Sequence, residues 1–118
     1  MTASNRASQT KSVQALGRLP DGVMNRTEAK YADRLEALRQ SGEIIRYDFE
    51  SEKLRIGKAC FYTPDFRVQL ASGEIQFHEV KGFWTDDARV KIKAAAASHP
   101  YKFIAASLKR GQWQFEEF

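Results

Sequence analysis

Apolar residues recur at two spacings along this chain, one typical of a helix and the other typical of strands. Tyr31, Leu35 and Leu38 form an apolar stripe at helical spacing, and Ser41-Gly42 follows as a signal that ends a helix. Further along, apolar and polar residues alternate, as they do in strands with one buried face. The segments with this pattern, or with a short apolar run, are 44–50, 54–56, 61–68, 75–81 and 101–106.

Turn and capping residues indicate how these segments connect. Residues 71–74 (Ala-Ser-Gly-Glu) separate the runs 61–68 and 75–81, which predicts an antiparallel hairpin. Thr85 is a suitable N-cap for a second helix that ends near Ser98. The predicted order is therefore α-β-β-β-α-β, an α/β fold with a mixed central sheet flanked by helices.

The composition changes after the first 23 residues and divides the chain into an arm and a domain. Residues 1–23 are rich in Ser, Thr, Asn, Gly and basic residues and contain few apolar ones. This composition predicts a basic, disordered arm, and such an arm is either a plain leader or a segment that grips phosphates. Residues 24–118 are expected to form a single domain, in which 112–118 adds an edge strand or packs as a tail.

Charge and cysteine content narrow the classes of function. The net charge of +4 and the pI of about 9.3 permit nucleic-acid binding without proving it. Cys60 is the only cysteine, which excludes an internal disulfide and a cysteine-rich zinc site. The two histidines, His78 and His99, are far apart in the sequence and disfavour a histidine metal site. Because the chain has neither an apolar run of about 18 residues nor a signal-peptide pattern, we expect it to stay in the cytoplasm.

Three charged residues on the two hairpin strands are the best candidates for chemistry. Glu79 and Lys81 are two positions apart, so in a strand they project from the same face. Asp65 follows a proline at the start of the neighbouring strand, which is a place where a strand tolerates proline. Two carboxylates and an ammonium group in this arrangement make a hard-oxygen cation site beside a positive charge. Such a site suits the hydrolysis of a phosphodiester.

Each of these residues also has a simpler interpretation. Pro64-Asp65 is a common turn sequence, and Glu79 with Lys81 could form an ion pair on a solvated face. The alternation that continues after Asp65 favours a strand at this point. Ile75 and Phe77 extend an apolar stripe towards Glu79, and Gly82 breaks the strand directly after Lys81. The charged pair is therefore expected near an opening at the end of a strand.

Glu28 is a fourth candidate, because it extends the apolar stripe of the first helix backwards at helical spacing. A carboxylate on that face needs a metal ion or a lysine beside it. The sequence Asn25-x-x-Glu28 equally fits a capping box, in which Glu28 satisfies the start of the helix. Glu36 is a competing glutamate on the same helix, but it lies off the stripe.

The set formed by Glu28, Pro64-Asp65 and Glu79-Val80-Lys81 resembles the PD-(D/E)xK superfamily of restriction-endonuclease-like nucleases. The resemblance covers about residues 24–106 and is greatest to small phage-encoded members, which are related to Holliday-junction-resolving endonucleases. The stretches that carry it are Asn-Arg-Thr-Glu-Ala-Lys-Tyr-Ala, Phe-Tyr-Thr-Pro-Asp-Phe and His-Glu-Val-Lys-Gly-Phe-Trp. It implies a restriction-endonuclease-like core in a protein of a bacterial or phage-infected cell.

The resemblance also implies a mechanism. Asp65, Glu79 and the backbone carbonyl of Val80 would hold Mg²⁺, for which Mn²⁺ can substitute, and Lys81 would position the attacking water. Glu28 would support a second cation or orient Lys81. Hydrolysis of DNA would leave a 5′-phosphate and a 3′-hydroxyl. Paired nicks on a two-fold symmetric junction would require a homodimer.

Contacts to DNA and the biological role stay open at the level of the sequence. Arg89 and Lys93 share a face of the second helix, Lys91 lies off it, and any of the three could neutralise phosphates. Trp84 either stacks on a distorted base or packs against this helix. The alternative functions are a non-catalytic DNA-binding or inhibitor module on a nuclease fold, a nicking repair enzyme and a transposon-end-cleaving nuclease.

Overall fold

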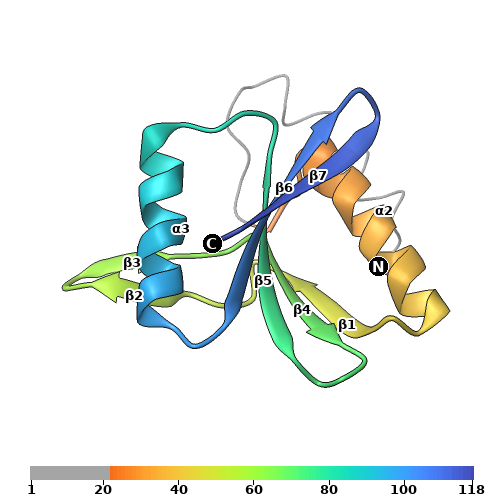
Figure 1. Ribbon diagram of the computed structural model, residues 1–118, viewed down its shortest axis with the longest axis horizontal. Coiled ribbons are helices and arrows are strands. Elements are labelled where there is room, and N and C mark those ends of the chain that lie inside the picture. The colour runs from red at the N-terminus through yellow and green to blue at the C-terminus, as the bar shows by residue number, and fades with distance from the viewer. Residues whose placement is uncertain (1–21) are drawn as a thin grey trace.

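The computed structural model describes residues 22–118, and its elements are labelled in Figure 1. The arm predicted for residues 1–23 therefore lies outside the described residues, except for its last two positions. The helices are α2 (Arg26–Ser41) and α3 (Asp86–Ser98). The strands are β1 (Ile44–Phe49), β2 (Leu54–Gly57), β3 (Cys60–Tyr62), β4 (Phe66–Leu70), β5 (Ile75–Lys81), β6 (Lys102–Lys109) and β7 (Gln112–Glu117).

Five strands form one mixed sheet in the order β1-β4-β5-β6-β7. β5 and β6 are parallel because α3 carries the chain back across the sheet between them, and the other neighbours are antiparallel. The predicted α/β class with a mixed sheet and two helices is thus confirmed. Neither helix in the described part of the chain combines the length and apolar content that crossing a lipid bilayer requires.

The helices cover opposite faces of the sheet, as Figure 1 shows. Tyr31 and Leu35 of α2 pack on Phe66 of β4 and Val80 of β5. The other face is covered by α3 and by the β2–β3 hairpin, whose buried side chains pack on the sheet residues Phe77 and Phe103. Each fully buried side chain of this size contributes roughly 1.5–3 kcal/mol. These two apolar layers hold β5 rigidly between them.

The ends of both helices follow the predicted signals. The Asn25 side chain accepts a hydrogen bond from the backbone N–H of Glu28, and the Glu28 carboxylate accepts one from the Asn25 N–H, both at 2.8 Å. This capping box starts α2. Gly42 ends the helix with φ of 87°, a conformation that glycine adopts without strain. The Thr85 hydroxyl caps α3 by accepting from the Ala88 N–H at 3.2 Å.

The prediction of one strand over 61–68 is wrong. β3 ends at Tyr62 and β4 begins at Phe66, so Asp65 lies in a bend between two strands of different sheets. Pro64 has no N–H to donate to a ladder, which favours an interruption at this point. β2 and β3 pair with each other as a separate hairpin inserted between β1 and β4.

The element order also needs correction. The predicted α-β-β-β-α-β corresponds to α2, β1, β4, β5, α3 and β6. The predicted segment 54–56 is β2, which pairs with the separate strand β3 and lies outside the main sheet. Residues 112–117 form β7, which pairs antiparallel with β6 at the edge of the sheet. Of the two alternatives for residues 112–118, the edge strand is therefore the one observed.

Candidate functional site

The register of β4 against β5 brings the two predicted carboxylates together. Phe66 is paired with His78, and this is the last pair of the ladder. Asp65, one residue earlier, therefore lies beside Glu79, one residue later. The four-residue turn after Leu70 fixes this register, because the N–H of Gly73 donates to the Leu70 carbonyl at 2.8 Å. Juxtaposition of the carboxylates thus follows from the hairpin that the sequence predicted.

Backbone and side-chain hydrogen bonds hold the cluster where the ladder ends. The Asp65 N–H donates to Glu79 Oε1 at 3.3 Å, and the Val80 N–H donates to Asp65 Oδ2 at 2.8 Å. Lys81 Nζ lies 3.2 Å from Glu79 Oε2. Asp65 and Glu79 are buried, whereas Lys81 is partly exposed. The structure therefore brings Asp65, Glu79 and Lys81 into one connected group, with Val80 in its backbone.

Tyr62 belongs to this group and was not predicted from the sequence. Its hydroxyl donates to Glu79 Oε1 at 2.6 Å in a buried position. Burial, followed by the charge of Glu79, raises the pKa of the Tyr62 phenol, so the hydroxyl stays protonated as a donor. A buried tyrosine hydroxyl needs a partner, and the proximity of Tyr62 to Asp65 in the sequence was the only available signal.

Glu28 joins the cluster from α2, while Glu36 does not. The Glu28 side chain lies close enough to Asp65 for the two carboxyl groups to affect each other's pKa. Of the two interpretations considered for Glu28, the capping box is observed, and the catalytic role stays a prediction. Glu36 is instead paired with Arg39 at 2.7 Å and accepts from the Tyr47 hydroxyl at 3.0 Å.

The electrostatics of the cluster reflect an excess of carboxyl groups. Burial, then the charges of Glu79 and Glu28, raise the pKa of Asp65 well above its usual range. Burial also raises the pKa of Glu28. Burial alone would lower the pKa of the Lys81 amine. The negative charges of Glu79 and Asp65 have the larger combined effect, so the pKa is raised. Three carboxyls thus share one ammonium group in a poorly solvated place.

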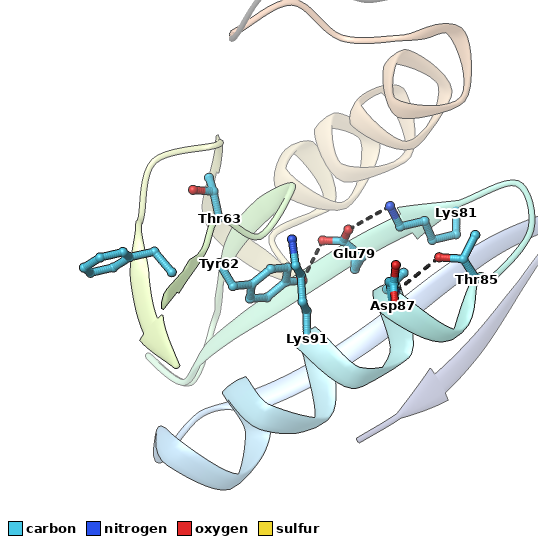
Figure 2. A pocket seen from close by; sticks show the side chains of 9 residues that line it. Tyr62, Thr63, Glu79, Lys81, Thr85, Asp87 and Lys91 are labelled. Atoms are coloured by element: carbon cyan, nitrogen blue, oxygen red, sulfur yellow. Dashed lines mark hydrogen bonds and ion pairs between the residues drawn. The ribbon is translucent and has the colours of Figure 1, made fainter. Parts of the chain in front are cut away.

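A cavity of about 380 Å³ opens over this cluster, as Figure 2 shows. Glu79 and Lys81 of β5 contribute to its lining. The β3 end of the hairpin and the residues after it line one side, and the first turns of α3 line the other. The lining residues outside β5 are Phe61, Tyr62, Thr63, Thr85, Asp87, Ala88 and Lys91. Glu79 and Lys81 therefore face a space that a substrate could enter, whereas Asp65 and Glu28 are not among the lining residues.

The donor set fits a hard divalent cation. Carboxylate oxygens are the ligands that Mg²⁺ prefers, and two or three of them repel one another here until a proton or cation is bound. Among residues 22–118, no three His, Cys, Asp or Glu side chains are arranged as a complete metal-binding group. Mg²⁺ is usually held by one or two carboxylates and keeps several waters.

The predicted DNA-contacting residues lie in different surroundings. Lys91 lines the cavity, as noted above. Arg89 is paired with Glu116 at 2.7 Å, and its guanidinium lies over the rings of Trp84 and Phe118 at 5.5 and 5.2 Å from their centroids. Lys93 is exposed on α3 outside the cavity lining. Of the four candidates, the structure thus brings only Lys91 to the carboxylate cluster.

Trp84 packs within the protein in this structure. Its ring lies 5.9 Å from that of Phe118 and belongs to the apolar layer beneath α3. Phe83, the residue before it, is 79% exposed. The packing alternative that the sequence offered for Trp84 is therefore the one observed.

Comparison of this chain with models of protein families, with curated proteins and with solved structures gave no match.

Proposed function

We propose that this protein is a metal-dependent DNA endonuclease of the PD-(D/E)xK type, with a restriction-endonuclease-like core. The observation that carries the proposal is the contact of Asp65, Glu79 and Lys81 where the β4–β5 ladder ends, at a cavity. The sheet supports it, because α2, β1, β4, β5, α3 and β6 follow the order that the resemblance implies. The basic net charge of +4 is consistent with a polyanionic substrate.

Asp65 and Glu79 are the residues proposed to hold Mg²⁺, together with the Val80 carbonyl, while Glu28 supports a second cation. Bound Mg²⁺, or Mn²⁺ in its place, supplies a Lewis acid that polarises the phosphate and lowers the pKa of a bound water. The residues of the chain then have distinct tasks. The Glu79 carboxylate keeps Lys81 in place, since the two are 3.2 Å apart.

Lys81 stabilises the charge that develops on the phosphoryl oxygens. Because its pKa is raised, the side chain stays an ammonium group and acts as a hydrogen-bond donor rather than as a base. Water attacks phosphorus, the bond from phosphorus to the 3′ oxygen breaks, and the products are a 5′-phosphate and a 3′-hydroxyl. Lys91 contributes a second positive charge from the opposite wall of the cavity.

Branched DNA is the proposed substrate, as for the junction-resolving enzymes that the sequence resembles. The described residues of one chain contain one such cluster, so two symmetric cuts in a four-way junction need two copies of the chain. Cleavage of a junction with linear duplex spared is the result that supports this selectivity.

The test is cleavage of supercoiled plasmid, linear duplex and a four-way junction in Mg²⁺, Mn²⁺ or EDTA. We expect cleavage in either metal and none in EDTA. Asp65→Asn and Lys81→Met should each lower the rate by about a hundredfold or more, because each removes a group that acts on the transition state. Glu36→Gln removes a carboxylate away from the cavity and serves as the control with unchanged activity.

Two results would refute the proposed reaction. One is cutting that continues in EDTA or in purified Asp65→Asn protein. The other is tight DNA binding by the wild-type protein with no cutting in either metal, which would favour the non-catalytic DNA-binding module.

A further inference from the structure

We propose that Tyr62 is a positioning residue, which fixes the Glu79 carboxylate so that Oε2 is the oxygen presented to the cation. This inference rests on the proposed function, because it assigns a role within the same site. It concerns a residue that lies outside the three charged positions of the motif. It also gives the β2–β3 hairpin a part in the chemistry.

Both oxygens of Glu79 are engaged, but in different ways. Oε1 accepts from the Tyr62 hydroxyl at 2.6 Å and from the Asp65 N–H at 3.3 Å. Oε2 lies 3.2 Å from Lys81 Nζ. Two neutral donors thus hold Oε1 on the side of the hairpin. Oε2 faces the ammonium group of Lys81 and is the oxygen that remains available to bind a metal cation.

Both donors to Oε1 come from one short stretch of chain. Tyr62 ends β3, and Asp65 follows it after Thr63 and Pro64. The Tyr62 ring is buried in the apolar layer with Ile92 of α3, so the direction of its hydroxyl is fixed by packing. Figure 2 shows the tyrosine reaching Glu79 from one side, with Lys81 on the other.

Loss of the hydroxyl should loosen this carboxylate without removing it. Groups that orient a metal ligand through a hydrogen bond typically change metal affinity or activity by about 10–100-fold when mutated. We therefore expect Tyr62→Phe to need about tenfold more Mg²⁺ for half-maximal cleavage. The rate at saturating Mg²⁺ should approach that of the wild-type protein. A residue with only a structural role would lower stability and leave this metal dependence unchanged.

A matched control exists in the contact between β1 and α2. The hydroxyl of Tyr47 donates to Glu36 Oε1 at 3.0 Å, so Tyr47→Phe also removes a hydrogen bond from tyrosine to glutamate. Its acceptor lies outside the cavity lining. Both variants keep the aromatic ring, and circular dichroism checks that both are folded. Tyr47→Phe should leave the metal dependence as it is in the wild-type protein.

The experiment measures Mn²⁺ binding to the full chain without DNA, by calorimetry and electron paramagnetic resonance, beside cleavage over a series of Mg²⁺ concentrations. Weaker Mn²⁺ binding by about tenfold in Tyr62→Phe, with Tyr47→Phe unchanged, supports the inference. Equal binding by wild-type and Tyr62→Phe protein overturns it while the proposed nuclease stands. A folded wild-type protein that neither binds Mn²⁺ nor cleaves DNA overturns both.

A second measurement needs no variant at position 62. Wild-type protein labelled with 3-fluorotyrosine gives a fluorine resonance for each tyrosine, and these are assigned with single Tyr→Phe variants at positions 31, 47 and 101. Addition of Mg²⁺ should shift the Tyr62 resonance and leave that of Tyr47 in place. A Tyr62 resonance that does not respond to a saturating metal concentration would contradict the inference.

Discussion

Asp65 is buried beside two other carboxyl groups, so its negative charge opposes folding at neutral pH. A carboxyl whose pKa is raised by folding adds stability when it is protonated, and this contribution is lost as the pH rises through the raised pKa. Asp65→Asn removes the charge, while its side-chain oxygen can still accept from the Val80 N–H. At pH 8 we expect this variant to be more stable than the wild-type protein by about 1 kcal/mol, or roughly 5 °C in Tm.

Thermal unfolding of both proteins in EDTA at pH 8 and pH 5 measures this difference. The gain should shrink as the pH falls from 8 to 5, because the raised pKa of Asp65 makes protonation of the wild-type carboxyl increasingly favourable at lower pH. Asp33→Asn changes an exposed aspartate of α2 and should leave Tm almost unchanged. A lower Tm for Asp65→Asn at pH 8 would show that the charge at this position does not strain the fold.

His78 is a second buried titratable residue, on the α2 face of β5. Its Nε2 lies 2.9 Å from Gln76 Oε1, so Nε2 carries the proton, and Nδ1 accepts from the Tyr31 hydroxyl at 2.6 Å. Burial, then the charge of Arg34, lowers its pKa from 6.5 to about 4. Between these pH values the unfolded chain binds the proton and the folded one does not, so stability falls as the pH falls.

An NMR titration of the His78 imidazole should therefore give a midpoint near pH 4. Between pH 7 and pH 4.5, denaturant unfolding should show a loss of stability in the wild-type protein that is smaller in His78→Gln. The difference between the two proteins isolates His78 from the carboxyl cluster, whose raised pKa values act in the opposite direction. An imidazole midpoint near 6.5 would rule out this linkage.

At the scale of elements, the sequence predicted the helix ends and turns that residues close together in the chain determine. The helix stripe, the capping box, Gly42 as the end of α2 and the turn after Leu70 depend on neighbouring residues and are confirmed. The contact between Asp65 and Glu79 followed from the same hairpin. The break between Tyr62 and Phe66 matches the turn that Pro64-Asp65 offered as the simpler interpretation. The continuous alternating pattern on either side favoured a single strand instead, and that choice was wrong.

Tyr62 was missed for a related reason. At its position the pattern required an apolar residue, and its ring is indeed buried. The partner of its hydroxyl, Glu79, is 17 residues away in the sequence. The contact between Tyr62 and Glu79 depends on the position of β3, which lies outside the main sheet and packs under α3. Long-range partners of buried polar groups depend on topology rather than on local composition.

Two lysines of helix α3, Lys91 and Lys93, allow the predicted DNA contacts to be tested at the scale of elements. Lys91 lines the cavity, whereas Lys93 is exposed two residues later and does not. Lys91→Gln should weaken binding to a four-way junction in EDTA and reduce the slope of log affinity against log salt by about one. Lys93→Gln is the matched control and should keep the wild-type slope. Equal slopes for Lys91→Gln and the wild-type protein would remove Lys91 from the DNA interface.

At the scale of the molecule, the mixed sheet was predictable because the strand–helix–strand connection from β5 through α3 to β6 normally yields a parallel pair. The pairing of the short strands was not predictable. Segments 54–56 and 112–118 were identified as strand candidates, but β3 was merged with β4, and the pairing of β2, β3 and β7 depends on edges that the rest of the fold provides. The contacts of the charged cluster were therefore easier to predict than the cavity walls around it.

The separation of the β2–β3 hairpin from the main ladder has a consequence for how this protein can change. Among the described residues its strands pair only with each other, and its tip, from Gly57 to Cys60, is not part of the cavity lining. Insertions or exchanges at the tip leave the five-stranded scaffold intact as long as Tyr62 is retained. Evolution and protein engineers thus have a module through which one wall of the cavity can be altered while Asp65, Glu79 and Lys81 keep their places at the end of the β4–β5 ladder.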